Sequence, residues 1–309
     1  MAAFTAKDVA ELRKQTGCGM MDCKRALEEA DGDLQAAIKI LREKGMAATA
    51  KKQSRIAAEG IVDVLTVGNT TAMIEVNTET DFVAKNETFR AFVRAVLETI
   101  IATRPATVED LMTKTMADGQ TVEAALQEKT YTIGEKLSLR RFVVVDGVVS
   151  TYIHGGGATG VIICFETAPE IAAKAEFAEF AKNIALQAAA MPAQYVDRDA
   201  VPAEVVEEEK AVLLKQMEQD PKMAGKPEKV LAGIVMGKLG KFFETACLME
   251  QAYVKEDSMK VSAYVKATAK ELGGDIKVVA FYRYDKGEGI QKREDDFAGE
   301  IAKMVGGSN

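Results

Sequence analysis

The sequence is poor in the residues and motifs that catalysis and metal binding usually require. It has 309 residues but one histidine and four cysteines, and the cysteines are too scattered for a disulfide framework or a zinc site. It contains neither a glycine-rich phosphate loop nor a nucleophile elbow. The usual enzyme signatures are therefore missing, and we expect a reducing, cytoplasmic compartment and no metal or other cofactor.

Long apolar runs and clusters of basic residues are also lacking. No stretch of about 18 apolar residues occurs, so we expect no membrane span. The start, MAAFTAKDVAELRKQ, carries acids at Asp8 and Glu11 and does not match a secretion or import signal. The formal net charge is −7, and lysines and arginines stand among acids. Because phosphate binding needs clustered cations, we expect no direct nucleic-acid partner.

The first pattern that the sequence does contain predicts three helices over residues 1–55. Thr5 and Asp8 can cap a first helix, which the sequence TGCG at 16–19 interrupts. MMDCKRALEEA then predicts a second helix, and Asp33 can cap a third that continues to Gly45. The next residues, AATAKKQSR, are expected to be either a linker or an extension of this third helix. Helices this short are marginal alone, so the three are expected to pack against one another.

From residue 60 the chain alternates between strands and helices and then repeats itself. Two strands and a helix are predicted over residues 60–101 and again over 147–190. Each predicted helix carries two phenylalanines three residues apart, at a constant offset of 88 residues between the copies. An internal duplication explains this, and two such units would form a two-layer α+β core. The four residues are Phe89 and Phe92, and Phe177 and Phe180.

Two further helical runs, separated by QDPKMAGKP, predict an antiparallel helical hairpin inserted into the second copy. A helix near residues 258–272 and a strand that closes the sheet follow it. The predicted domains are a three-helix module (1–55), a first core repeat (56–145), a second core repeat (146–200 and 245–285), a coiled-coil hairpin of the dimerisation type (201–244) and a C-terminal helical module (286–309).

Two passages of this sequence resemble the bacterial elongation factor Ts family. They are LRKQTGCGMMDCKRAL, Leu12–Leu27, and EVNTETDFVAK, Glu75–Lys85. The order of the predicted domains is also similar to that family, including its ubiquitin-associated (UBA)-like N-terminal domain, so the resemblance covers essentially the whole chain. Within the motifs, Thr78 stands where the family usually has Cys or Ser. Ala158 replaces a common basic residue, which would weaken one partner contact.

The resemblance implies a guanine-nucleotide exchange factor of translation elongation rather than an enzyme. Such a factor binds the GTPase elongation factor Tu with GDP and promotes GDP release, so that GTP can rebind. The family's TDFV element enters beside the partner's magnesium site and displaces the ion. The implied site residues are Thr80, Asp81, Phe82 and Val83, with further partner contacts at Leu12, Arg13, Gly19, Met20, Met21 and His154.

Taken without the resemblance, several of these residues have simpler interpretations. Asp81 would cap the following helix, and Phe82 would be a buried hydrophobic staple. Met20 and Met21 would be core residues of a three-helix module, and we expect at least one of them to be buried. The resemblance instead favours Phe82 as an exposed wedge, with Asp81 beside it to bind donors of the partner.

Two other classes of function compete with nucleotide exchange. A protein-interaction scaffold would explain the UBA-like module but would leave the TDFV turn without a role. A small-molecule enzyme would need Asp81 and His154 as an acid–base pair in one pocket, although the sequence places them at equivalent ends of two repeats. The sequence does not determine whether the protein dimerises; a homodimer and a 2:2 complex with elongation factor Tu are both possible, and the helical hairpin could contact its own copy or elongation factor Tu.

Overall fold

The computed structural model describes residues 4–220 and 226–291, which form two compact units. The first unit comprises residues up to 63, 74–142 and the chain from 285, and the second comprises 64–73 and 143–284. The helix predicted for the C-terminal module (286–309), in the sequence EDDFAGEIAKMVGGSN, lies outside the described residues. Among the helices that are described, none is long and apolar enough to cross a membrane.

Three helices form the predicted N-terminal module: α1 (Ala6–Thr16), α2 (Met20–Glu29) and α3 (Leu34–Lys52). Thr5 and Asp8 make a reciprocal capping box at the start of α1. Of the two alternatives for AATAKKQSR, the structure has the helix extension, because α3 continues past Gly45 to Lys52. Gly45 is buried there, and a Cβ at this position would already lie 3.5 Å from the Cβ of Tyr131. Gly45 is therefore an interior residue of α3 that lies beside Tyr131, and it does not end the helix.

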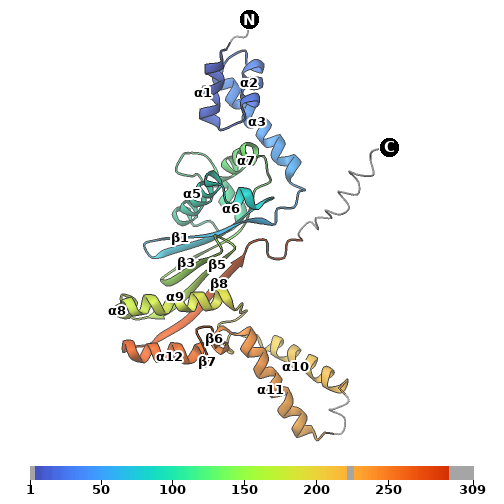
Figure 1. The fold of residues 1–309 in the computed structure, drawn as a ribbon, viewed down its shortest axis with the longest axis vertical. Coiled ribbons are helices and arrows are strands. Elements are labelled where there is room, and N and C mark those ends of the chain that lie inside the picture. Colours follow the sequence, from blue (N-terminus) through green and yellow to red (C-terminus); the bar gives the residue numbers. More distant parts are fainter. Residues whose placement is uncertain (1–3, 221–225, 292–309) are drawn as a thin grey trace. The chain divides into compact units, whose positions relative to one another are not determined.

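The two core copies have the same topology, which extends further than the sequence pattern indicated. Their sheets have the strand orders β1-β2-β3 and β4-β5-β8. Figure 1 labels strands β1 and β3 of the first sheet and β5 and β8 of the second. The first copy consists of β1 (Glu59–Val67), β2 (Thr70–Thr78), α4 (Asp81–Ala84), α5 (Glu87–Thr103), α6 (Val108–Thr113), α7 (Val122–Ile133) and β3 (Ser138–Asp146). The second consists of β4 (Val148–His154), β5 (Thr159–Thr167), α8 (Pro169–Ala172), α9 (Ala175–Ala190), α12 (Val261–Leu272) and β8 (Ile276–Asp285).

Two pairs of equivalent helices, α4 with α8 and α7 with α12, have equal lengths in the two copies. Helix α4 begins at residue 81 and α8 at 169, which repeats the offset of 88 seen for the phenylalanine pairs. Helix α7 covers 122–133 and α12 covers 261–272, so this second pair is offset by 139 residues. Each of these two helices ends at a glycine in the left-handed conformation and leads into the third strand of its sheet. The duplicated unit is therefore longer than strand–strand–helix.

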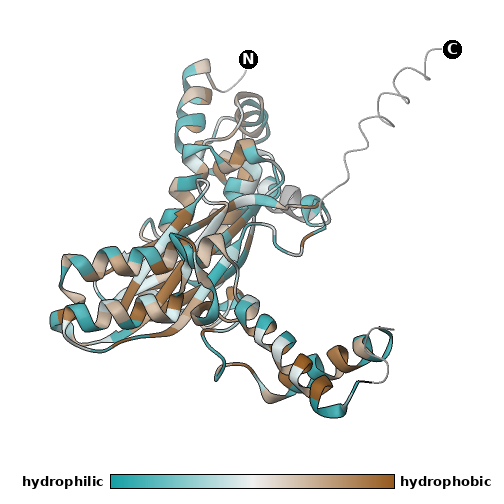
Figure 2. Ribbon diagram, turned by 60° about the horizontal axis from the view of Figure 1, so that its bottom comes forward, coloured by the Kyte–Doolittle hydropathy of each residue, from teal (hydrophilic) through white to brown (hydrophobic). Residues whose placement is uncertain are grey.

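The repeated phenylalanines occupy the centres of the two copies. All four are buried, on helices α5 and α9. In the second copy, α9 packs on the sheet of β4 and β5, and Phe177 meets Phe165 edge-on with ring centroids 5.4 Å apart. Burial of one such side chain contributes about 1.5–3 kcal/mol. Figure 2 shows apolar residues along the strands and on the helices that cover them.

The predicted helical hairpin corresponds to α10 (Ala203–Glu218) and α11 (Glu228–Ala246). Leu213 and Met217 of α10 pack against Val235 and Leu239 of α11. After it come a short helical turn (Leu248–Glu250) and a small antiparallel sheet of β6 (Ala252–Tyr253) and β7 (Glu256–Lys260). Strand β7 occupies the residues where the next helix was expected to begin, so α12 starts later, at Val261.

Candidate functional site

The predicted TDFV element forms the short helix α4, between strand β2 and helix α5. Thr80 precedes it in an extended conformation, and Ala84 is buried beneath it. The next helix, α5, has its own cap: the side-chain oxygen of Asn86 accepts hydrogen bonds from the backbone N–H groups of Thr88 (2.8 Å) and Phe89 (3.2 Å). The interpretation of Asp81 as the cap of that helix is therefore wrong.

Phe82 projects from α4 into solvent. Its exposed fraction is 80%, the largest among the big apolar side chains that the structure describes as exposed. Val83, the next residue, is half-buried and Ala84 is buried, so the helix is anchored through its other face. A buried hydrophobic staple is excluded by this exposure. An exposed phenylalanine on a short anchored helix has the geometry of an interface anchor.

Asp81 forms an ion pair with Lys85, the residue that follows the last residue of α4. Its carboxylate accepts a hydrogen bond from the Lys85 ammonium at 2.6 Å. This hydrogen bond lowers the pKa of Asp81, so the side chain is ionised at neutral pH. Both side chains are well exposed, so the pair adds little to stability. The exposed face of α4 thus presents an aromatic ring next to a carboxylate and an ammonium group.

The second core copy shows what this short helix looks like without an exposed aromatic residue. Glu170 of α8 takes the place of Phe82 and is also exposed. Ile171 takes the place of Val83 and is buried. The same fold therefore accepts a charged residue at the exposed position. Because packing within the chain does not require Phe82, its apolar surface is available for a partner.

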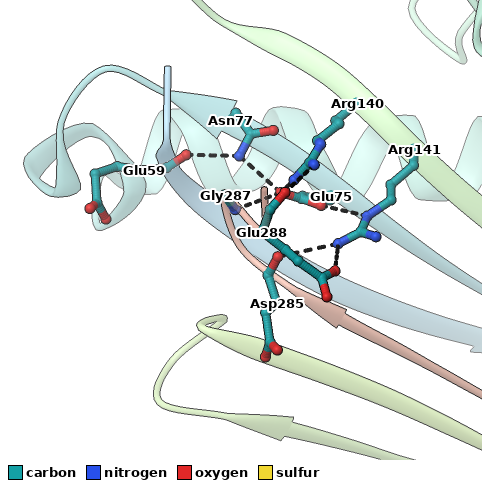
Figure 3. Close-up of polar contacts among 8 residues, drawn as sticks. All are labelled: Glu59, Glu75, Asn77, Arg140, Arg141, Asp285, Gly287 and Glu288. Atoms are coloured by element: carbon teal, nitrogen blue, oxygen red, sulfur yellow. Dashed lines mark hydrogen bonds and ion pairs between the residues drawn. The ribbon is translucent and has the colours of Figure 1, made fainter. Parts of the chain in front are cut away.

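Strand β2, which leads into α4, is fixed by a buried carboxylate (Figure 3). Glu75 is fully buried and accepts hydrogen bonds from Arg140 (2.9 Å) and Arg141 (2.6 Å) of β3. It also accepts one from the Asn77 amide (3.0 Å) and one from the Gly287 N–H (2.7 Å). Burial alone would raise the pKa of Glu75, but these four donors together lower it. Glu75 is therefore a charged, fully paired group.

The Glu75 cluster joins β2 and β3 to the chain that follows β8. Arg141 also binds Glu288 at 2.9 Å, and Arg140 donates to the Glu288 carbonyl. Gly287 adopts φ +69°, and a Cβ there would overlap the Ala58 carbonyl, so this position requires glycine. The strand that carries α4 is thus tied to two other segments of the first unit.

The N-terminal residues implied by the resemblance fall into buried and exposed groups. Met20 and Met21 are 54% and 61% exposed, so the expectation that one of them is core is wrong; Cys23 takes the inward position instead. Leu12 is completely buried within the three-helix module, which disagrees with a direct partner contact by its side chain. Arg13 and Gly19 are exposed. An exposed methionine pair suits an adaptable binding surface.

His154 lies at the end of β4, in the second unit, and is exposed. Its Nδ1 is 3.3 Å from the hydroxyl of Tyr152. Asp81 belongs to the first unit, so the structure does not place these two residues of the enzyme hypothesis in one compact unit. Within residues 4–220 and 226–291, no group of three or more His, Cys, Asp or Glu side chains is arranged to hold a metal ion.

The chain was also compared with known protein families. The family model described as "Elongation factor TS" matches residues 79–288, more than half of the chain. The matched region contains α4 and the β4–β5 hairpin with His154. It begins directly before Thr80 and does not include the three-helix module.

Proposed function

The chain belongs to the elongation factor Ts family, and from this premise we propose that α4 displaces the magnesium ion that helps to hold GDP in elongation factor Tu. The family consists of translation elongation factors that exchange the nucleotide of elongation factor Tu. The observation that carries the proposal is the 80% exposure of Phe82 on a short helix whose other face is anchored by the buried Ala84. Thr80, Asp81 and Val83 complete the inserted element.

A wedge of this kind acts through the strict geometry of the ion. Mg²⁺ requires near-ideal octahedral coordination, so a small shift of the partner's helices beside the ion is enough to weaken its binding. Once the ion is lost, the GDP phosphates lose a main counter-charge and GDP dissociates faster. Burial of the Phe82 ring in the partner supplies about 1.5–3 kcal/mol toward this shift. The exposed Asp81 carboxylate is available to donors at the partner's surface.

Exchange is then a coupling free energy between two binding sites. A thousandfold weakening of GDP binding corresponds to roughly 4 kcal/mol. Because the coupling is reciprocal, GDP must weaken the binding of the exchange factor by the same amount. One ring supplies part of this energy, and contacts elsewhere must supply the remainder. No bond is made or broken by the protein itself.

The other contacts are proposed for two further surfaces. Arg13, Gly19, Met20 and Met21 would face the nucleotide domain of elongation factor Tu, with residues 1–55 as the docking module. His154 would contact its third domain. Leu12 supports the first surface from within, because its side chain is buried. We place the protein in the cytoplasm, where translation takes place.

Release of fluorescent GDP from elongation factor Tu tests this function directly. Catalysed release supports an exchange factor, whereas binding without release supports the scaffold alternative. If the protein neither binds nor accelerates release, the proposed function is wrong. The mass of the mixed complex in solution distinguishes a 1:1 from a 2:2 assembly, and a 1:1 mass would exclude pairing of the α10–α11 hairpin with its own copy in that complex.

A further inference from the structure

Thr80, the residue that leads into α4, is held by a carboxylate from a distant part of the first unit. Glu135 accepts a hydrogen bond from the Thr80 hydroxyl at 2.6 Å and another from the Thr80 backbone N–H at 2.9 Å. The hydroxyl of Thr78 donates to the Thr80 carbonyl at 2.7 Å. The donor groups and the carbonyl of Thr80 are therefore all engaged just before the helix begins.

The residues next to Thr80 and Glu135 are also hydrogen-bonded to each other, but here the donor belongs to the segment of Glu135. The backbone N–H of Lys136 donates to the Glu79 carboxylate at 2.6 Å, so residues 79–80 and 135–136 are joined in both directions. Glu79 also binds Arg55 at 3.2 Å. The Lys136 ammonium donates to the carbonyls of Gln53 and Arg55, at 2.6 and 2.8 Å. Glu135 thus acts from a segment that is itself firmly attached.

The position of Glu135 follows from how α7 ends. Gly134 takes the left-handed conformation, with φ +87°, and stops the helix. Glu135 comes directly after it, and β3 begins at Ser138 beside β2. The carboxylate is thereby fixed next to the end of β2 and is half-buried together with Thr80. Little freedom remains for the first residue of the wedge element.

The second copy provides an internal comparison. At the offset of α7 and α12, Gly274 occupies the place of Glu135, and a Cβ there would overlap the Ile171 side chain. Ala168 occupies the place of Thr80 and has no side-chain hydroxyl. One connection is retained, since the Thr167 hydroxyl donates to the Asp275 carbonyl at 2.8 Å. The carboxylate that holds Thr80 is therefore found in the copy with the exposed aromatic residue and is replaced by glycine in the other.

We propose that Glu135 is a positioning residue for nucleotide exchange, which holds α4 rigid so that Phe82 pushes on the partner instead of moving back itself. This inference rests on the proposed function. If α4 could swing on binding, part of the interaction energy would be spent on moving the wedge rather than the partner's magnesium site. Glu135 reaches neither the partner nor the nucleotide in this role; it acts through Thr80.

The test uses full-length Glu135→Ala and Glu135→Gln proteins, with Glu123→Ala as a control. Glu123 is an exposed carboxylate on α7, so its removal makes the same change in charge away from Thr80. We expect exchange of the Thr80 amide hydrogen with solvent to speed up about tenfold in Glu135→Ala, because a charge-assisted hydrogen bond is lost. Glu135→Gln keeps one acceptor oxygen and should show an intermediate effect. The control should match the wild type.

Stopped-flow release of labelled GDP supplies the functional readout. At saturating exchange factor, Glu135→Ala should lower the release rate about fivefold to tenfold, while the concentration for half-maximal effect changes less than about twofold. In the Phe82→Ala background the Glu135 substitution should have no further effect, because a residue that acts through the wedge has nothing left to position.

Three results would overturn the inference. One is a Thr80 amide that exchanges equally fast in wild type and Glu135→Ala. Another is an unchanged saturating release rate. The third is an equal loss of rate with and without Phe82, which would indicate general destabilisation. A wild-type protein that fails to accelerate GDP release would instead contradict the proposed function, and the Thr80 amide alone would then decide whether Glu135 fixes α4.

Discussion

Phe82 and Glu170 occupy the same position, the second residue of a four-residue helix, in the two copies of the duplicated core. Both side chains are exposed, and the helices that carry them begin 88 residues apart, at 81 and 169. The pair therefore separates what the fold requires from what a partner requires. The next residue is half-buried in the first copy (Val83) and buried in the second (Ile171), but only the first copy has an aromatic ring at the exposed position.

Phe82→Ala should leave the fold unchanged and slow nucleotide exchange. The side chain is 80% exposed, so its removal costs little stability, and the thermal midpoint should stay within about 1 °C of the wild type. Loss of roughly 1.4 kcal/mol of coupling would reduce the rate of GDP release about tenfold. Glu170→Ala is the matched control and should affect neither quantity. Equal exchange by the two variants would remove Phe82 from the mechanism.

Asp81→Ala and Asn86→Ala should separate partner binding from helix capping. Asp81 pairs with Lys85, whereas Asn86 caps α5, so only the second substitution removes a cap. Asn86→Ala should destabilise the protein by about 1 kcal/mol with a lower thermal midpoint. Asp81→Ala should keep its midpoint but release GDP more slowly than the wild type. A large drop in the midpoint of Asp81→Ala would show that the carboxylate has a structural role instead.

Stability should fall in acid because of Glu75. Its pKa is lowered in the folded protein, so its contribution is fully present above the unfolded pKa near 4.5 and is lost as pH falls through the folded pKa. Glu75→Gln should be destabilised by roughly 3 kcal/mol at pH 7, because two arginines lose their buried anionic partner. Its thermal midpoint should then decline less than that of the wild type between pH 6 and pH 3.

Glu166→Gln is the control for the acid experiment, since Glu166 is exposed on β5. Its thermal midpoint should change with pH in the same way as that of the wild type, from pH 6 to pH 3. If Glu75→Gln also follows that dependence, the Glu75 cluster is not the source of the acid sensitivity.

The wedge should depend on magnesium if it acts by displacing the ion. With magnesium chelated, GDP release from elongation factor Tu alone should already be fast. The intact protein should then add less acceleration than at millimolar Mg²⁺, and Phe82→Ala should approach the intact protein, because a contact that removes an ion has little left to do once the ion is gone. Stopped-flow release with and without chelator measures this. An equally large Phe82 effect in both conditions would contradict ion displacement but not exchange.

A fragment lacking residues 1–50 should remain folded but bind elongation factor Tu poorly. The remaining core keeps both sheets, although Tyr131 loses its contact with the three-helix module. Burial raises the pKa of Tyr131 to about 12, and spectrophotometric titration of the fragment should show it closer to 10. Affinity equal to that of the full chain would contradict the docking role of the N-terminal module.

Local patterns in the sequence were enough to predict much of this fold. The phenylalanine pairs revealed the duplication because they are large, buried and regularly spaced. The end of the third helix stayed open between Gly45 and the AATAKKQSR segment, because no local pattern distinguishes a linker from a helix that continues to Lys52. The prediction that Met20 or Met21 is a core residue was wrong, because hydrophobicity alone does not distinguish a core residue from a residue on a binding surface. The end of the third helix and the burial of the two methionines both depend on tertiary packing, which a local sequence pattern does not contain.

The same limit applies to the candidate site. The resemblance identified residues 80–83, and the structure shows where they lie. Glu135 could not be found in this way, because its contact with Thr80 joins residues 55 positions apart in the chain. Its signal becomes visible only when the two copies are aligned through α7 and α12, where glycine stands opposite glutamate. That alignment requires the helix bounds, since the two copies differ by the inserted hairpin.

The Glu75 cluster also imposes an order on folding during synthesis. Glu75 and the two arginines of β3 leave the ribosome early, but Gly287, which donates the fourth hydrogen bond, lies 212 residues after Glu75. Until that residue emerges, the carboxylate and its arginines lack the backbone that covers them. The first half of the nascent chain is therefore unable to reach its final stability alone, and a product that stops before residue 285 should be more sensitive to proteases than the finished protein.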